Sequence, residues 1–110
     1  MTDVYTTAEW IAKTGHEEAF IEAWQAFATW AHGMPGAEIL RLAQDLEVAS
    51  RFVSFGSWGD IESAHRWKAD PEFRDRMSRV QEHVAKFTPS ELHVVRVVGD
   101  EGAGAGAGNG

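Results

Sequence analysis

The stretch "FGSWGDIESAHRWKADPEF", residues 55–73, contains the end of a predicted strand followed by two predicted helix starts. Asp60 can cap a short helix that runs through Trp67, because a carboxylate accepts hydrogen bonds from the free N–H groups of a first turn. Asp70 before Pro71 is a second start signal, since proline suits the first position of a helix. The stretch is therefore a strand-to-helix corner. Its large aromatic side chains either fill a core or wall a reaction pocket.

The chain before this corner predicts a strand, a helix and a hairpin. Residues 4–12, "VYTTAEWIA", are β-branched and aromatic and predict a strand. Thr14 and Glu17 form a predicted capping box, and Gly33 with Pro35 should end the helix that follows. The helix carries one apolar stripe with spacings of four, three and four residues: Phe20, Trp24, Phe27 and Ala31. Residues 37–43 and 51–58 predict an antiparallel pair of strands.

The chain after the corner predicts a helix and a final strand. The helix that opens at Asp70 has a second stripe with the same spacings: Phe73, Met77, Val80 and Val84. Pro89 lies beyond its expected end, and residues 91–98, "ELHVVRVV", predict the last strand.

The order β-α-β-β-α-β predicts an α+β, ferredoxin-like domain: a four-stranded antiparallel sheet with two helices on one face. The predicted strands 51–58 and 91–98 carry apolar residues on both sides. Helices can cover only one face, so a second apolar face favours a partner. We expect a homodimer whose sheets pack face to face, which makes a dimeric α+β barrel.

Composition excludes several classes of function. The net charge is −7 and no basic run is present, which argues against nucleic-acid binding. The chain has no cysteine, and its five histidines show no metal-ligand spacing, so we expect no metal site. No apolar run approaches the ~20 residues of a membrane span, and a cytoplasmic protein is the default expectation. One domain should occupy residues 1–98, followed by a Gly/Ala-rich tail, residues 99–110, that should be disordered.

Three segments together resemble the antibiotic biosynthesis monooxygenase family. They are "YTTAEWIAKTGHEEAF", "GMPGAEILRLAQD" and "RFVSFGSWGDIESAHRWKADPEFRDRM", within a match that runs from about Val4 to Val98. The resemblance implies the same dimeric barrel. It also implies a pocket between sheet and helices and oxygenation of quinols or aromatic polyketides without a cofactor. The residues that would line this pocket are Phe20, Trp24, Trp67, Phe73 and Met77 from the helices, and Ala8, Trp10 and Phe52 from the strands.

The chain also departs from the family's pattern. The haem-degrading branch has a histidine at the position of Met77 and an asparagine near Ala8, so the resemblance does not extend to haem degradation. The polyketide-oxidising branch has an asparagine at Ser54, a tyrosine near Ala64 and an arginine near Met77. Of that set this chain keeps Trp58, with Ser54 as a weaker hydrogen-bonding group.

Three residues are candidates for catalysis. Trp58 can stack on an aromatic substrate, and Ser54 can donate a hydrogen bond. His65 can act as a base near neutral pH, although Trp67 is about 200° around the same helix, so both can hardly face one pocket. The alternative reading makes the tryptophans core anchors and His65 an exposed residue.

Two functions remain open from sequence. One is a cofactor-independent monooxygenase that uses O2 on an aromatic, quinol-like or polyketide-like molecule. The other is a non-catalytic module that binds a small apolar ligand on the same fold.

Overall fold

The computed structural model describes residues 4–99 of the chain, and its strands pair in the order β2-β3-β1-β4. Every neighbouring pair is antiparallel. The elements are β1 Val4–Ala12, α1 Glu17–His32, β2 Ala37–Gln44, β3 Arg51–Trp58, α2 Ile61–Ala69, α3 Phe73–Gln81 and β4 Val84–His93. The predicted ferredoxin-like class is confirmed. The second helical segment consists of two helices, α2 and α3, so three helices cover the sheet.

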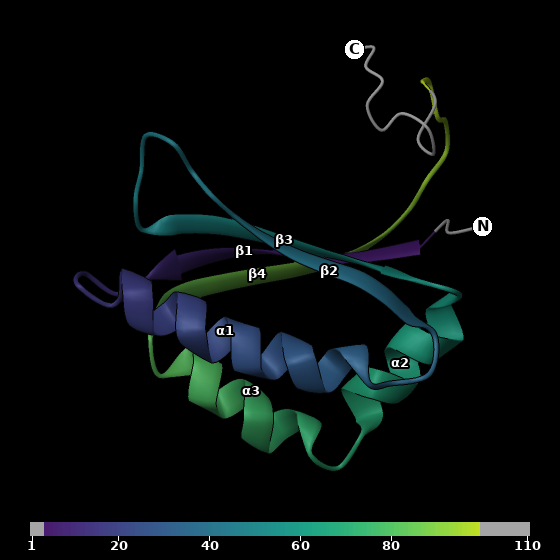
Figure 1. The fold of residues 1–110 in the computed structure, drawn as a ribbon, viewed down its shortest axis with the longest axis horizontal. Coiled ribbons are helices and arrows are strands. Elements are labelled where there is room, and N and C mark those ends of the chain that lie inside the picture. The colour runs from purple at the N-terminus through teal and green to yellow at the C-terminus, as the bar shows by residue number, and fades with distance from the viewer. Residues whose placement is uncertain (1–3, 100–110) are drawn as a thin grey trace.

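The helices lie together on one side of the sheet (Figure 1). The loop between β2 and β3 rises on the other side, and so does the chain that follows β4. The sheet therefore has an inner face, which the helices cover, and an outer face, which no described element covers.

The strand register assigns residues to the inner face. Ala8 lies opposite Ser54, and Trp10 lies opposite Phe52. Because side chains alternate along a strand, these four residues point to one side of the sheet. Phe20 of α1 contacts the rings of both Trp10 and Phe52, at centroid distances of 5.3 and 4.8 Å, so this side is the inner face.

The helix ends agree with the sequence signals in part. Asp60 Oδ1 accepts a hydrogen bond from the backbone N–H of Ser63 at 2.7 Å, so the predicted cap of α2 is confirmed. Gly33 follows the last residue of α1, as predicted. The predicted capping box of Thr14 and Glu17 is wrong. The helix begins at Glu17 after His16, which makes no side-chain capping bond.

The last strand differs most from the sequence prediction. It spans Val84–His93 rather than residues 91–98, and Val84 pairs with Ala12 instead of continuing the stripe of α3. Pro89 misled the prediction, because proline normally interrupts a sheet. β4 is an edge strand, where a residue without a backbone N–H can be accommodated. Residues 94–98 follow the strand with no regular structure.

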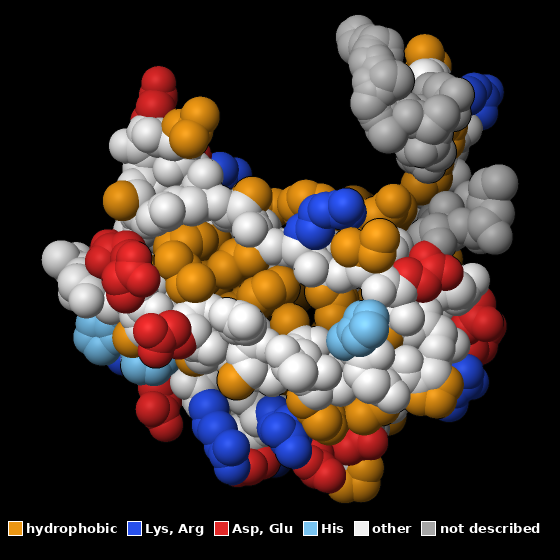
Figure 2. All heavy atoms as spheres, in the orientation of Figure 1, with side chains coloured by type: hydrophobic (Ala, Val, Ile, Leu, Met, Phe, Trp, Pro, Cys, Tyr) orange, Lys and Arg blue, Asp and Glu red, His pale blue; other side chains and the backbone are white. Residues whose placement is uncertain are grey.

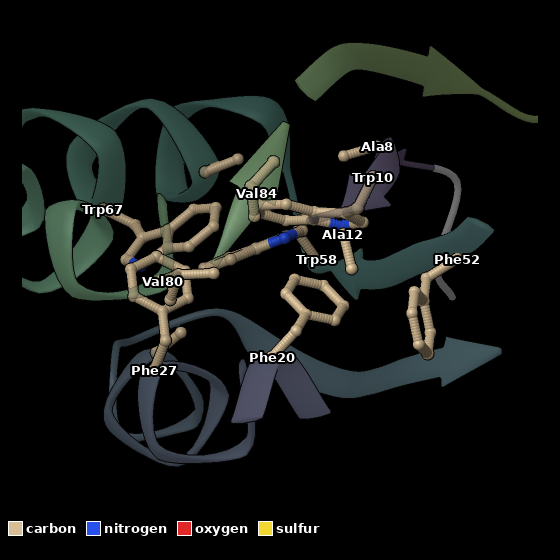
Figure 3. Close-up of a cluster of buried hydrophobic side chains, with 12 residues drawn as sticks. Ala8, Trp10, Ala12, Phe20, Phe27, Phe52, Trp58, Trp67, Val80 and Val84 are labelled. Atoms are coloured by element: carbon tan, nitrogen blue, oxygen red, sulfur yellow. The ribbon is translucent and has the colours of Figure 1, made fainter. Parts of the chain in front are cut away.

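The core lies between the inner face and the helices. Phe20, Phe52, Trp58 and Val80 are the largest of its fully buried side chains. Figure 3 shows Trp58 of β3 among ring side chains from β1, α1 and α2. Aromatic burial of this extent stabilises the corner that residues 55–73 form.

The predicted disordered tail, residues 99–110, lies outside the described residues except for Gly99. Among residues 4–99, no helix is both long enough and apolar enough to cross a bilayer.

Candidate functional site

A cavity opens between the inner face of the sheet and the helices. The centre of a water molecule can occupy about 70 Å³ of it. Its lining residues are Thr6, Thr7, Ala8, Trp10, Trp24, Phe27, Ala28, Ala31, Leu40, Ser54, Phe55, Gly56, Trp67, Lys68, Phe73, Met77, Phe87 and Pro89. Most of these are apolar or aromatic, and a few polar groups stand among them. This composition is typical of pockets for small organic ligands.

Two grooves share residues with the cavity. One groove, between α1 and β2, has Trp24, Ala28 and Leu40 in common with it. Figure 2 shows hydrophobic side chains exposed along this seam, below the front edge of the sheet. The other groove runs along α2 and α3 and shares Lys68, Phe73 and Met77. A ligand larger than the cavity can therefore extend toward either surface.

The absence of a side chain at Gly56 helps to keep the cavity open. A Cβ at this strand position would collide with the end of the Leu40 side chain and approach Thr6 Oγ1 to 3.5 Å. Glycine here lets Leu40 and Thr6 both reach the cavity wall.

Two hydroxyl groups of the cavity wall are each held by a tryptophan. Trp10 Nε1 donates to Ser54 Oγ at 2.9 Å, and Trp58 Nε1 donates to Thr6 Oγ1 at 3.0 Å. Each indole N–H occupies one lone pair of its hydroxyl oxygen, so the hydroxyl hydrogen remains available for another acceptor. Thr6 and Ser54 both line the cavity, which makes them candidate donors to a bound ligand.

Trp67 lacks such a partner. Its ring stacks on Trp58 with centroids 4.9 Å apart and an interplanar angle of 29°. It is 7% exposed, and its buried Nε1 has no hydrogen-bond acceptor among the described residues. Buried N–H groups are normally paired, so the Nε1 of Trp67 is a candidate donor to a bound ligand.

Lys68 is the only charged residue among the described residues that line the cavity. Its Nζ donates to Glu91 Oε2 at 2.9 Å, and His65 Nε2 lies 3.1 Å from Glu91 Oε1. The hydrogen bond from Lys68, and to a lesser degree the one with His65, lowers the pKa of Glu91 from its ordinary value, so this carboxylate is ionised at neutral pH.

The structure brings most of the predicted pocket residues together. Ala8, Trp10, Trp24, Ser54, Trp67, Phe73 and Met77 all line the cavity. Phe20, Phe52 and Trp58 are not among the lining residues, because each is packed into the closed core with at most 1% of its surface exposed. Trp58 acts on the cavity through its contacts with Thr6 and Trp67.

His65 lies outside the cavity. Its side chain is 56% exposed and is paired with Glu91 on the surface. The sequence argument that His65 and Trp67 cannot face the same pocket therefore agrees with the geometry. No group of three or more metal-ligating side chains occurs within residues 4–99.

Sequence reasoning missed Lys68 and Phe87 as lining residues. Phe87 was overlooked because its segment was assigned to a helix end, although it lies beside Trp10 with ring centroids 4.5 Å apart. Lys68 follows Trp67 by one residue, and the helical rotation of about 100° gave no reason to place both on one face of α2. No local pattern would have identified it.

The family of antibiotic biosynthesis monooxygenases is matched by residues 4–79. A search of curated proteins gave no match.

Solved structures show the same fold at low sequence identity. A point mutant of SnoaB, a cofactor-independent oxygenase from Streptomyces nogalater, superimposes with a TM-score of 0.82 at 14% identity; the match covers 89% of this chain and 98% of that one. PA3566 from Pseudomonas aeruginosa gives 0.73 at 23% identity, with 87% and 97% covered. Protein SO0527 from Shewanella oneidensis gives 0.74 at 19% identity, with 84% and 91% covered.

Proposed function

The chain belongs to the antibiotic biosynthesis monooxygenase family, and from this we propose that it is a cofactor-independent monooxygenase for an aromatic, quinol-like or polyketide-like small molecule. One observation carries the proposal. The aromatic cavity contains two hydroxyl groups, on Thr6 and Ser54, that tryptophan N–H groups hold in place. Dioxygen is the only other reactant required.

The reaction balances without a cofactor. An activated CH2 group of the ionised substrate gives one electron to O2, and the substrate radical and superoxide then combine through a new C–O bond. The peroxide takes up a proton. Cleavage of its O–O bond, with loss of the remaining hydrogen as water, leaves a carbonyl. The sum is R2CH2 + O2 → R2CO + H2O.

The protein contributes orientation and a dry environment to this reaction. Stacking on Trp67 and Phe73 would hold a flat ring, and the apolar wall would exclude water from the anion. The Ser54 and Thr6 hydroxyls would donate to the oxygen on which charge develops, and such preorganised donors are typically worth ~10²–10³ in rate.

An oxygen-uptake assay tests the proposal. Chelator-treated protein, free of added flavin, is mixed with an anthrone, which carries the required CH2 group, and uptake is compared with that of Ala28→Leu. Ala28 is buried in α1 and lines both the cavity and a groove, so the larger side chain should block the ligand. Ala26→Leu is the matched control, because Ala26 is exposed on the same helix.

The expected result is uptake by the wild type and by Ala26→Leu, with at least a tenfold loss in Ala28→Leu. Overpacking destabilises a core by about 1–3 kcal/mol, so circular dichroism must first show that the variant is folded. Equal uptake by both leucine variants would remove the cavity from the reaction.

The absence of a base from the cavity favours a second candidate function. None of the described residues that line the cavity is a carboxylate or a histidine. A module that binds a small apolar ligand needs no base. Saturable quenching of tryptophan fluorescence by the same anthrone, without oxygen uptake above buffer, would favour that function.

We also propose that the active form is a homodimer that joins through the outer face of the sheet. Val53 alternates with inward-facing neighbours and so lies on the uncovered face. Two projections flank this face (Figure 1), and they carry exposed apolar side chains. On the β2–β3 loop these are Leu46 and Val48, and after β4 they are Val95, Val97 and Val98. Exposed apolar surface of this extent favours a partner.

Sedimentation equilibrium tests the dimer. The wild type should have the mass of two chains, and Val53→Glu should shift it toward one, because a carboxylate would be buried in the contact. Ala26→Glu, on the exposed side of α1, should stay dimeric. A single-chain mass for the wild type would rule the dimer out.

A further inference from the structure

The side-chain polar groups that line the cavity are hydrogen-bond donors. Ser54 and Thr6 each have an oxygen occupied by an indole N–H, which leaves the hydroxyl hydrogen for a ligand. The hydroxyl of Thr7 is already used, because it donates to the backbone oxygen of Ser54 at 2.8 Å. The described lining residues include no carboxylate and no imidazole that could take a proton from a ligand.

Two further donors belong to the adjacent residues Trp67 and Lys68. The buried Nε1 of Trp67 has no acceptor within the described part of the chain. The Lys68 ammonium carries three N–H groups, and one of them donates to Glu91. The side chain of Lys68 is 32% exposed and belongs to both the cavity and the groove along α2 and α3, so its charge lies at the junction of the two.

The cavity is too small to enclose an aromatic ring. A cavity that binds benzene measures about 150 Å³, whereas this one offers about 70 Å³. An aromatic ligand must therefore extend into a groove. The groove along α2 and α3 brings it past Lys68, with Arg74 farther along the same groove.

We propose that the site binds its substrate as a preformed anion, with Lys68 as the counter-ion. The substrate class is an acidic phenol or an enolised 1,3-dicarbonyl that is ionised near neutral pH and carries a second oxygen acceptor for the wall hydroxyls. The inference rests on the proposed function and deepens it. With donors and a cation but no carboxylate or histidine among its described lining residues, the site can stabilise negative charge but has no base to create it, so the acidity must come from the substrate.

Glu91 modulates this recognition. Its carboxylate holds Lys68 at the cavity edge and also opposes an anionic ligand, because it neutralises part of the ammonium charge. His65 binds the other oxygen of the same carboxylate. Removing the charge of Glu91 should therefore strengthen the binding of an anion, whereas removing Lys68 should weaken it.

A chromogenic phenol tests the proposal without turnover. 4-Nitrophenol changes colour on ionisation, so absorbance under anaerobic conditions reports the protonation of the bound ligand across a pH series. Bound to the wild type, its pKa should fall by about one unit, which corresponds to a tenfold preference for the anion. 4-Nitroanisole, which cannot ionise, provides the neutral comparison.

Four variants, one of them a control, complete the design. Lys68→Met should abolish the pKa shift and weaken phenolate binding about tenfold, while 4-nitroanisole binding is unchanged. Lys68→Arg should restore most of the shift, and Glu91→Gln should enlarge it. Arg79→Met is the matched control for loss of a cation on α3 and should leave the shift unchanged, because Arg79 lines neither the cavity nor the groove along α2 and α3.

A shift that survives in Lys68→Met, or wild-type binding of 4-nitroanisole as tight as that of the phenolate, would overturn the inference. So would the failure of both compounds to bind. These outcomes are separate from oxygen uptake. Oxygen uptake without a pKa shift would support the oxygenase function and contradict the anion site. A pKa shift without oxygen uptake would support the anion site and contradict the oxygenase function.

Discussion

The indole rings of Trp58 and Trp67 stack at a centroid distance of 4.9 Å, but only Trp58 has a hydrogen-bond acceptor among the described residues. The pair joins the end of β3 to the last turn of α2, so it packs the corner on which the fold depends. One ring is closed into the core and the other lines the cavity. The corner is therefore both a core and a pocket wall.

This asymmetry predicts different effects for two matching substitutions. Trp58→Phe removes ring surface and the hydrogen bond to Thr6. Trp67→Phe removes a similar amount of ring surface, together with an N–H group that has no partner within residues 4–99. Trp58→Phe should therefore lower the free energy of unfolding by about 1 kcal/mol more than Trp67→Phe does. Urea denaturation measures both. Equal losses would show that the Trp58 hydrogen bond contributes nothing to stability.

Ser54→Ala should destabilise the protein from inside the cavity wall. It leaves the N–H of Trp10 without an acceptor, and Trp10 is 2% exposed. An unsatisfied buried donor costs about 1–3 kcal/mol. Thr14→Ala, at an exposed position before α1, is the control and should change stability by less than about 0.5 kcal/mol. Indistinguishable unfolding free energies for the two variants would contradict the proposed support of Ser54 by Trp10.

Alanine substitutions at Gly36 and Gly15 distinguish the effect of backbone strain from that of a steric collision. Both have positive φ, +90° and +84°, where a side chain is strained by about 1–2 kcal/mol. A Cβ at Gly36 would also collide with the Ser63 side chain, whereas Gly15 has open space around it. Gly36→Ala should thus lower the thermal midpoint more than Gly15→Ala. A larger loss at Gly15 would mean that the turn before β2 does not pack on α2.

Protonation of Asp60 should contribute to the loss of folding stability at acidic pH. The backbone N–H of Ser63, the Ser63 side chain and the charge of Arg66 lower the pKa of Asp60 from 3.8. Its folded pKa is therefore below its unfolded pKa. The stabilisation is present above 3.8 and is lost as the pH falls through the lower folded value.

Asp60→Asn tests this acid dependence because asparagine also caps helices but does not titrate. Unfolding free energies measured from neutral pH to below 3.8 should decline less steeply for the variant than for the wild type. Parallel curves would show that Asp60 does not contribute to acid denaturation.

Local signals in the sequence were sufficient for the start of α2 and for the inner face, but the predicted start of the next helix at Asp70 and Pro71 is wrong, because α3 begins at Phe73 after Glu72. The Asp60 cap and the alternation from Trp10 to Ala8 depend on neighbouring residues, and the structure agrees with both. Val84 followed a helical spacing but pairs with Ala12, a contact across 72 residues that no local pattern contains. Pro89 could be accommodated in a strand only because that strand lies at the sheet edge, which is a property of the whole fold.

The site was predictable to the same extent. Trp67 of α2 and Phe73 and Met77 of α3 were expected in the pocket, which they line. Whether an aromatic side chain is fully buried or lines the cavity depends on packing from several elements. Phe20 and Trp24 belong to one stripe, but Phe20 is fully buried and Trp24 lines the cavity. The pairing of Ser54 with Trp10 depends on strand register, which residue spacing alone does not give.

Isotope labelling of the product tests the central claim most directly. Chelator-treated protein is incubated with an anthrone under ¹⁸O2, and the product is analysed by mass spectrometry against a protein-free control. The account predicts a quinone with one ¹⁸O atom per molecule, formed faster than in buffer and lost in Ala28→Leu. A product formed no faster than in buffer, or formed equally well by Ala28→Leu, would contradict the claim that the cavity is an oxygenase site.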